Sequence, residues 1–275
     1  MDALSSTDIV LLVLGVMVAA GLGGLLAGLL GVGGGIVIVP ALFWVFMFTQ
    51  FDPALSMHMA VATSLTTIVA TSLSSARAHH RRGAVDLVIV RRWAPWLGLG
   101  ALGGGALAGG LNTGALMLVF GLVGIAVAIN FLAPKALIVG SALPTARGAQ
   151  AGLATSIGGI SALMGIGGGT LGVPVLVAFS VPVHRAVGTA STFGVIIAVP
   201  AVVALVISGL NVAGRPPLSV GYVNLIAAAL ILPISSSMAP LGARLAHAID
   251  AKWVRRAFAV FLAATSLRML WTALV

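Results

Sequence analysis

Two glycine-rich stretches contain the residues of this chain best suited to bind a ligand. They read Gly31-Val-Gly-Gly-Gly-Ile-Val-Ile-Val-Pro40 and Gly165-Ile-Gly-Gly-Gly-Thr-Leu-Gly-Val-Pro174, and they lie 134 positions apart. Each glycine triplet precedes a short apolar run that favours a helix. The free N–H groups and the positive dipole end of such a helix attract an anion. We therefore predict a substrate site at Gly33, Gly34, Gly35, Gly167, Gly168, Gly169 and Thr170.

The glycine stretches fit two other kinds of site poorly. A phosphate loop would end in Gly-Lys-Ser/Thr after a strand, and a dinucleotide site would need a βαβ unit; the sequence contains neither. Close helix packing is the remaining alternative, and it is the role we expect for Gly100, Gly104 and Ala108.

Hydroxyl side chains occupy matching places after the two glycine stretches. Thr63 and Ser64 follow the first, and Thr189 and Ser191 follow the second. These hydroxyls could donate hydrogen bonds to the oxygens of an anion. Alternatively, they bond to the carbonyl four residues earlier or to a neighbouring helix, as Ser and Thr in membrane helices commonly do. The sequence leaves both interpretations open.

The titratable residues do not form a catalytic or metal-binding set. All five acidic residues lie at the ends of apolar segments: Asp2, Asp8, Asp52, Asp86 and Asp250. His58 and His184 occupy matching positions, and we expect them to be helix-end residues near the two membrane faces. Arg268 lies inside the last apolar run, where it could face a cavity or, as we favour, extend outward to the membrane surface. We predict no enzyme activity, no metal and no cofactor.

Composition identifies a membrane protein. The chain of 275 residues is 60% hydrophobic and 7% charged, and its mean hydropathy is +1.20. Soluble domains have about 25% charged residues. The net charge of +9 comes from cations in short loops, so it predicts topology rather than nucleic-acid binding. The absence of cysteine excludes disulfides and thiol chemistry.

The two halves of the chain align along most of their length, which predicts an internal duplication. His58 to Ser64 aligns with His184 to Ala190 at an offset of 126, while Asp86 with Asn224 and Gly104 with Gly242 share an offset of 138. We predict a first repeat at 1–134, a cytoplasmic linker at 135–147 and a second repeat at 148–275, within a single membrane domain.

Each predicted repeat has a broken apolar stretch followed by three long apolar runs. The broken stretches cover 8–48 and 148–180, and the long runs cover 54–76, 84–110, 113–133, 186–207, 219–245 and 253–275. The pieces after the breaks are shorter than the roughly 20 residues that cross a bilayer. They therefore predict re-entrant hairpins, and three crossings per repeat predict two repeats of inverted topology in an all-α polytopic protein.

The distribution of cations agrees with an inverted arrangement. Cytoplasmic loops are enriched in Lys and Arg. The loop with Arg77, Arg81 and Arg82 is basic, whereas its counterpart near residues 208–219 carries only Arg215. Placing the linker inside makes every Lys and Arg cytoplasmic except Arg215 and Arg268, and it predicts extracytoplasmic termini.

The duplicated motifs resemble those of the TauE/SafE family of sulfite exporters, also called the toluene sulfonate uptake permease family. The resemblance rests on the two glycine-rich stretches, on the Ala-Val-x-Thr segments Ala60 to Thr63 and Ala186 to Thr189, and on the duplicated layout. It implies transport of small sulfur-containing anions, such as sulfite or organosulfonates, across a bacterial inner membrane.

Two modes of transport are compatible with this resemblance. The leading hypothesis is export, because a negative interior pushes each negative charge outward by about 2.3 kcal/mol per 100 mV. The alternative is import coupled to protons or sodium. The expected partners are a small anion and the lipid bilayer, with no nucleic acid; the sequence does not determine an oligomeric state.

Overall fold

The computed structural model describes residues 6–31, 33–48, 52–133, 137–245 and 251–275. The described chain is almost entirely helical. Its first half contains α1 (Ser6–Leu30), α2 (Gly35–Phe48), a 3-10 turn η1 (Pro53–Leu55), α3 (Ser56–His80), α4 (Leu87–Gly110) and α5 (Thr113–Leu132). Its second half contains α6 (Arg147–Met164), α7 (Gly169–Ala178), α8 (Val183–Gly209), β1 (Ser219–Val220), β2 (Val223–Asn224), α9 (Leu225–Leu245) and α10 (Ala251–Leu274).

The helices confirm an all-α polytopic membrane protein. Within the described residues, five helical segments are long and apolar enough to cross a bilayer: Pro53–His80, Thr113–Leu132, Val183–Gly209, Leu225–Leu245 and Arg256–Leu274. The six long apolar runs predicted from the sequence correspond to α3, α4, α5, α8, α9 and α10.

Helices end at both glycine-rich stretches, as predicted. Helix α1 ends at Leu30, and Gly33 and Gly34 follow with φ of 82° and 74°. Helix α6 ends at Met164, and Gly165 follows with φ of 69°. Side chains disfavour this left-handed backbone, so glycine allows the chain to turn sharply here.

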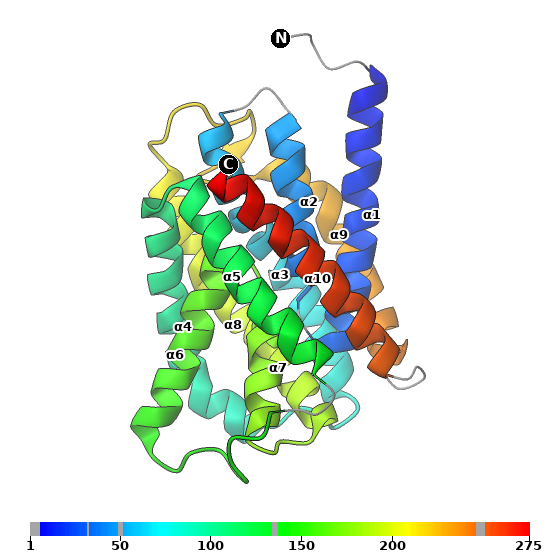
Figure 1. The fold of residues 1–275 in the computed structure, drawn as a ribbon, viewed down its shortest axis with the longest axis vertical. Coiled ribbons are helices and arrows are strands. Elements are labelled where there is room, and N and C mark those ends of the chain that lie inside the picture. Colours follow the sequence, from blue (N-terminus) through cyan, green and yellow to red (C-terminus); the bar gives the residue numbers. More distant parts are fainter. Residues whose placement is uncertain (1–5, 32, 49–51, 134–136, 246–250) are drawn as a thin grey trace.

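The chain reverses direction at each break (Figure 1). Helix α1 descends from the upper end of the view and α2 returns toward that end, whereas α6 rises from the lower end and α7 returns to it. The α3–α4 connection also lies at the lower end, and α10 finishes in the upper half. Helix α2 has 14 residues and α7 has 10, both fewer than a full crossing requires.

One helix boundary differs from the sequence-based expectation. The predicted run 219–245 is helical only from Leu225, because β1 and β2 form a short antiparallel hairpin before it. Pro216 and Pro217 precede the hairpin, and Gly221 within it has a φ of 56°. The Asn224 side chain then accepts a hydrogen bond from Ala227 N at 2.9 Å and caps the start of α9.

Glycines bring helices of the two halves into close contact. A Cβ atom at Gly24 in α1 would overlap with the carbonyl of Ser235 in α9, and one at Gly158 in α6 would overlap with that of Leu97 in α4. Gly104 contacts Gly159 in the same way, and Gly242 contacts Leu25. Such contacts between small residues are typical of helix packing in membranes. The predicted packing role of Gly104 is therefore confirmed.

These glycine contacts form matched pairs. Gly24 and Gly158 differ by 134 positions, and their partners Leu97 and Ser235 differ by 138. The same two offsets relate the contact between Gly104 and Gly159 to the one between Gly242 and Leu25. Glycines at equivalent positions of the two halves thus make equivalent backbone contacts with the opposite half.

Candidate functional site

The two glycine-rich breaks meet in the buried interior. A Cβ atom at Gly33 would lie 2.7 Å from the Cα of Gly167, and one at Gly35 would lie 2.9 Å from the Cα of Ile166. The glycines of both triplets are buried. The backbones of the two halves therefore touch where both short helices begin.

Backbone N–H groups are available at both helix starts. Gly34 O accepts from Val37 N at 3.1 Å and Ile38 N at 3.2 Å, and Gly168 O accepts from Gly172 N at 2.7 Å. Among the described residues, no acceptor pairs with the N–H groups of Gly34, Gly35, Gly168 or Gly169. Buried unpaired donors at a helix N-terminus have the chemistry that an anion needs.

Two apolar side chains cover the breaks, and sequence reasoning missed both. Ile68 of α3 lies beside Gly33 and Gly35, and Phe193 of α8 lies beside Gly168. Both side chains are fully buried. Large apolar residues are common in membrane helices, so nothing in the sequence distinguishes these two from their neighbours.

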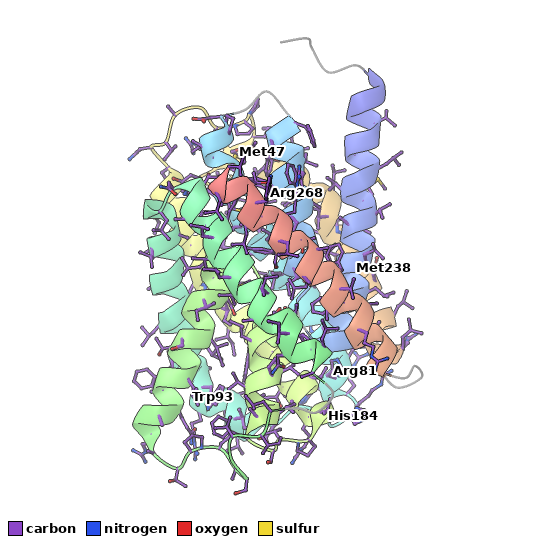
Figure 2. The ribbon with its side chains drawn as sticks, viewed as in Figure 1. Met47, Arg81, Trp93, His184, Met238 and Arg268 are labelled. Carbon is purple, nitrogen blue, oxygen red and sulfur yellow. The ribbon has the colours of Figure 1, made fainter. Side chains whose placement is uncertain are left out.

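An aromatic cluster supports Phe193 from the lower end of the molecule. Its ring stacks on Trp93 with centroids 5.8 Å apart, and Trp93 is labelled near that end in Figure 2. Trp93 Nε1 donates to Gln150 Oε1 at 3.2 Å, and Gln150 Nε2 donates to Pro144 O at 2.6 Å. This cluster connects α8, α4, α6 and the segment that precedes α6.

Ser64 is the predicted hydroxyl that reaches a break directly. Its Oγ donates to Gly165 O at 2.8 Å, so α3 of the first half binds the break of the second half. Thr170, in the first turn of α7, is fully buried. Ser64 and Thr170 therefore lie with the glycines at the centre.

Thr63 and Thr189 lie at contacts between the halves instead. Thr63 Oγ1 accepts from Asn224 N at 3.0 Å, and Thr189 Oγ1 accepts from Asp86 N at 2.9 Å. Asn224 caps α9 and Asp86 caps α4, and those helices begin at opposite ends of the molecule. Ser191 Oγ donates within its own helix to Gly188 O at 2.7 Å.

The two equivalent histidines have different surroundings. His184 is exposed and lies at the lower end of Figure 2. His58 lies in the first turn of α3, as a helix-end residue should, but only 4% of it is exposed. Its burial was not expected from the sequence.

Arg268 does not enter the centre of the molecule. It is exposed in the upper half of α10, and its guanidinium carbon lies 5.1 Å from the centroid of the Trp44 ring. A cation over an aromatic face is electrostatically favourable. Of the two positions considered from the sequence, the outward one is observed.

Comparison with known proteins identifies the family. The family model described as "Sulfite exporter TauE/SafE" matches residues 16–269. The chain is 30% identical over 258 residues to a "Probable membrane transporter protein" of Haemophilus influenzae, covering 92% of this chain and 96% of that protein. It is also 30% identical over 200 residues to the "Probable membrane transporter protein YunE" of Bacillus subtilis, covering 66% of this chain and 71% of that protein.

No solved structure matches the chain significantly. The family consists of membrane transporters rather than enzymes. The Haemophilus influenzae relative agrees with the family match over nearly the whole chain, and the long apolar helices agree with a membrane protein. The chain therefore belongs to the TauE/SafE sulfite exporter family of multi-pass membrane transporters.

Proposed function

We propose that this transporter exports small sulfur-containing anions, such as sulfite or organosulfonates, through a central site between the two glycine-rich breaks. The observation that carries the proposal is the meeting of two helix N-termini at Gly33 and Gly167, with buried N–H groups on both sides. Two N-terminal dipoles that converge on one point favour negative charge there. The family description agrees with this substrate class.

We further propose that the protein consists of two inverted repeats, 1–134 and 148–275, joined by a cytoplasmic linker at 135–147. The matched glycine contacts support this arrangement, as do the paired bonds of Thr63 with Asn224 and Thr189 with Asp86. A two-fold relation between the halves would produce each of these pairs. Helices α1 with α2 and α6 with α7 would then be re-entrant hairpins from opposite faces.

The cations orient the proposed transporter. Arg81 lies in the lower half of Figure 2, and the basic loop to which it belongs indicates that this side is cytoplasmic. The upper end, with Arg215 and Arg268, would be extracytoplasmic. The start of α1 and the end of α10 both lie on this side. The membrane in this proposal is the bacterial inner membrane.

The described conformation is closed at the proposed site. Gly33 and Gly167 are in backbone contact, and Ile68 and Phe193 pack against the breaks. An anion would enter only when the breaks separate and one of these side chains withdraws. Phe193, supported by Trp93 near the lower end, would be the cytoplasmic barrier.

In the proposed mechanism, hydrogen bonds bind the anion and the membrane potential drives its export. The proposed site has only backbone N–H groups and the hydroxyls of Ser64 and Thr170, so it would bind the anion without a fixed positive charge. Weak binding of this kind permits release on the other side. The carboxylates of Asp52 and Asp86 cap helix ends rather than line the breaks. The potential alone would then drive export.

Flux in proteoliposomes tests the proposal. Purified protein would be reconstituted, and sulfite flux measured at voltages of either sign, with and without proton or sodium gradients. We expect flux that follows voltage alone. Flux that requires an ion gradient would contradict uncoupled export and favour the coupled importer.

The substrate class needs its own controls. Taurine-like and aromatic sulfonates, sulfate and chloride would be compared with sulfite in the same vesicles. The Gly33→Val variant is the matched negative control, because a side chain there would overlap with the backbone of Gly167. Flux of chloride as large as that of sulfite would contradict selectivity for sulfur-containing anions.

A further inference from the structure

His58 connects three segments at the upper end of the molecule. Its Nε2 lies 2.8 Å from Leu111 O, at the turn between α4 and α5. Its ring stacks on Tyr222 of the β1–β2 hairpin, with centroids 4.9 Å apart and planes at 28°. Tyr222 is 4% exposed, like His58 itself. The imidazole is therefore enclosed between the two halves of the chain.

The hydrogen bonds determine which nitrogen carries the proton. A carbonyl oxygen can only accept, so Nε2 of His58 must donate to Leu111 O. In the neutral ring, Nδ1 then has a free lone pair, and it has no hydrogen-bond partner among the described residues. His58 thus has a buried basic nitrogen without a hydrogen-bond partner among the described residues.

The groups around His58 do not neutralise an imidazolium. Tyr222 stays neutral, because burial raises the pKa of its hydroxyl even though the Arg215 charge opposes this. Arg215 donates to Val212 O at 2.7 Å and Leu210 O at 2.9 Å, and it is itself a cation. Asp52 caps η1 through Ala54 N.

The other neighbouring segments add no charge. The α4–α5 turn, residues 110–114, contains no titratable residue, and the first two turns of α3 contain none besides His58. Arg268 also lies in the upper half, where its guanidinium group packs over the ring of Trp44. A proton on His58 would therefore remain without an ionised partner in the enclosed state.

We propose that His58 is a proton-binding site that controls opening of the transporter at its extracytoplasmic end. Water stabilises an imidazolium far better than an enclosed apolar site does. Protonation therefore favours the state in which Tyr222 and the α4–α5 turn move away and water reaches the ring. An imidazole changes charge between about pH 5 and pH 8, so acid outside the cell opens this end and alkali closes it.

The equivalent position in the second half cannot respond in this way. His184 is already exposed, so no enclosure has to open there for water to reach the ring. Of these two equivalent histidines, only His58 is enclosed. The assignment of the His58 end as extracytoplasmic rests on the orientation given in the proposed function. The predicted response to protons does not depend on the identity of the substrate.

A cysteine reporter tests the proposal without any transport measurement. The chain has no cysteine, so Ser56→Cys provides a single thiol two residues from His58, at a site that is 1% exposed. Its rate of labelling by a membrane-impermeant maleimide would be measured across the pH range. The same reporter with His58→Gln corrects for the intrinsic pH dependence of the thiol.

We expect the ratio of the two rates to rise at least about threefold as the pH falls from 8 to 5. His184→Gln, the matched control, should leave this ratio unchanged. A ratio that stays constant with pH would overturn the proposal. So would a response that persists in His58→Gln, or one that His184→Gln abolishes.

A second variant keeps the proposal testable if His58→Gln does not fold. Tyr222→Ala removes the ring that covers His58, so it should make the reporter react rapidly already at pH 8 and reduce the pH dependence at least about threefold. Slow, strongly pH-dependent labelling in Tyr222→Ala would overturn the proposed enclosure. Failure of sulfite flux would count against the proposed function alone, because none of these measurements uses sulfite.

Discussion

The hydroxyl oxygen of Thr189 accepts a hydrogen bond from the backbone N–H of Asp86 at 2.9 Å, which fastens α8 of the second half to the start of α4 in the first. Thr63 makes the corresponding bond with Asn224 at 3.0 Å, from α3 to the start of α9. In each pair the donor also caps a helix with its side chain. One threonine on each side thus aligns two helices of different halves.

Removing the Thr63 hydroxyl should lower the free energy of unfolding more than removing the Thr189 hydroxyl. Asn224 is 5% exposed, so Thr63→Val leaves a buried N–H unpaired and should lower the free energy of unfolding by about 1 to 3 kcal/mol. Asp86 is half-buried and water can replace the bond, so Thr189→Val should lower it by about 1 kcal/mol or less. Unfolding in detergent would be followed by circular dichroism.

Thr66→Val is the control for these two variants. Thr66 Oγ1 donates to Ala62 O of its own helix, so its loss leaves no N–H group unpaired. If Thr63→Val and Thr66→Val were equally stable, the hydrogen bond between Thr63 and Asn224 would not contribute measurably to stability, contrary to the prediction.

Substituting alanine for two adjacent glycines in α4 should have opposite effects on the stability of the protein. Gly104→Ala places a methyl group against the Gly159 carbonyl and should lower stability by about 1 to 3 kcal/mol. Gly103 has no atom within 4 Å of an added Cβ, so Gly103→Ala should be neutral or stabilising by up to about 1 kcal/mol. Melting temperatures of both variants would be compared in one detergent. A lower value for Gly103→Ala than for Gly104→Ala would refute the packing described between α4 and α6.

Ser64→Ala should reduce flux by altering the second break. The variant removes the 2.8 Å bond to Gly165 O, so the N–H groups at Gly168 and Gly169 would be held less firmly in the geometry that binds an anion. We expect voltage-driven sulfite flux to fall by about tenfold, equivalent to about 1.4 kcal/mol.

Thr71→Val is the matched control for Ser64→Ala. Thr71 is also buried in α3, but its hydroxyl bonds to Thr67 O of the same helix at 3.1 Å. Its flux should stay close to that of the unchanged protein. Equal losses in the two variants would show that the bond from Ser64 has no special role.

Phe193→Ala should increase anion leak while lowering stability. Loss of this buried ring should lower the free energy of unfolding by about 3 to 5 kcal/mol and uncover the start of α7. Flux per folded protein at a fixed voltage would be measured after the folded fraction is determined by size-exclusion chromatography. Unchanged flux per folded molecule would exclude Phe193 as a barrier.

Phe120→Ala provides the comparison for Phe193→Ala. Phe120 is equally buried but lies in α5. We expect a similar loss of stability without added leak. Leak in both variants would indicate general loosening of the fold.

Local chemistry explains what could be predicted from the sequence. The helix breaks follow from Gly31, Gly33, Gly34 and Gly165, because glycine alone adopts the left-handed backbone observed there at little cost. The long apolar runs predict spanning helices, because hydrocarbon leaves no other partner for backbone N–H and C=O groups. Asp86 lies at the end of an apolar segment, as predicted, and the structure shows that it caps the start of α4. These features depend on a residue and its immediate neighbours.

Only the tertiary structure decided which distant residues meet. Ile68 and Phe193 cover the glycine breaks, Thr63 and Thr189 bind opposite ends of the bundle, and His58 is buried although His184 is exposed. A single sequence contains no signal for these contacts, because an apolar or hydroxyl side chain on a membrane helix can face lipid, a neighbouring helix or a cavity with the same local pattern. Their position depends on how the two halves pack, which is determined by the sum of many small contacts across the whole chain.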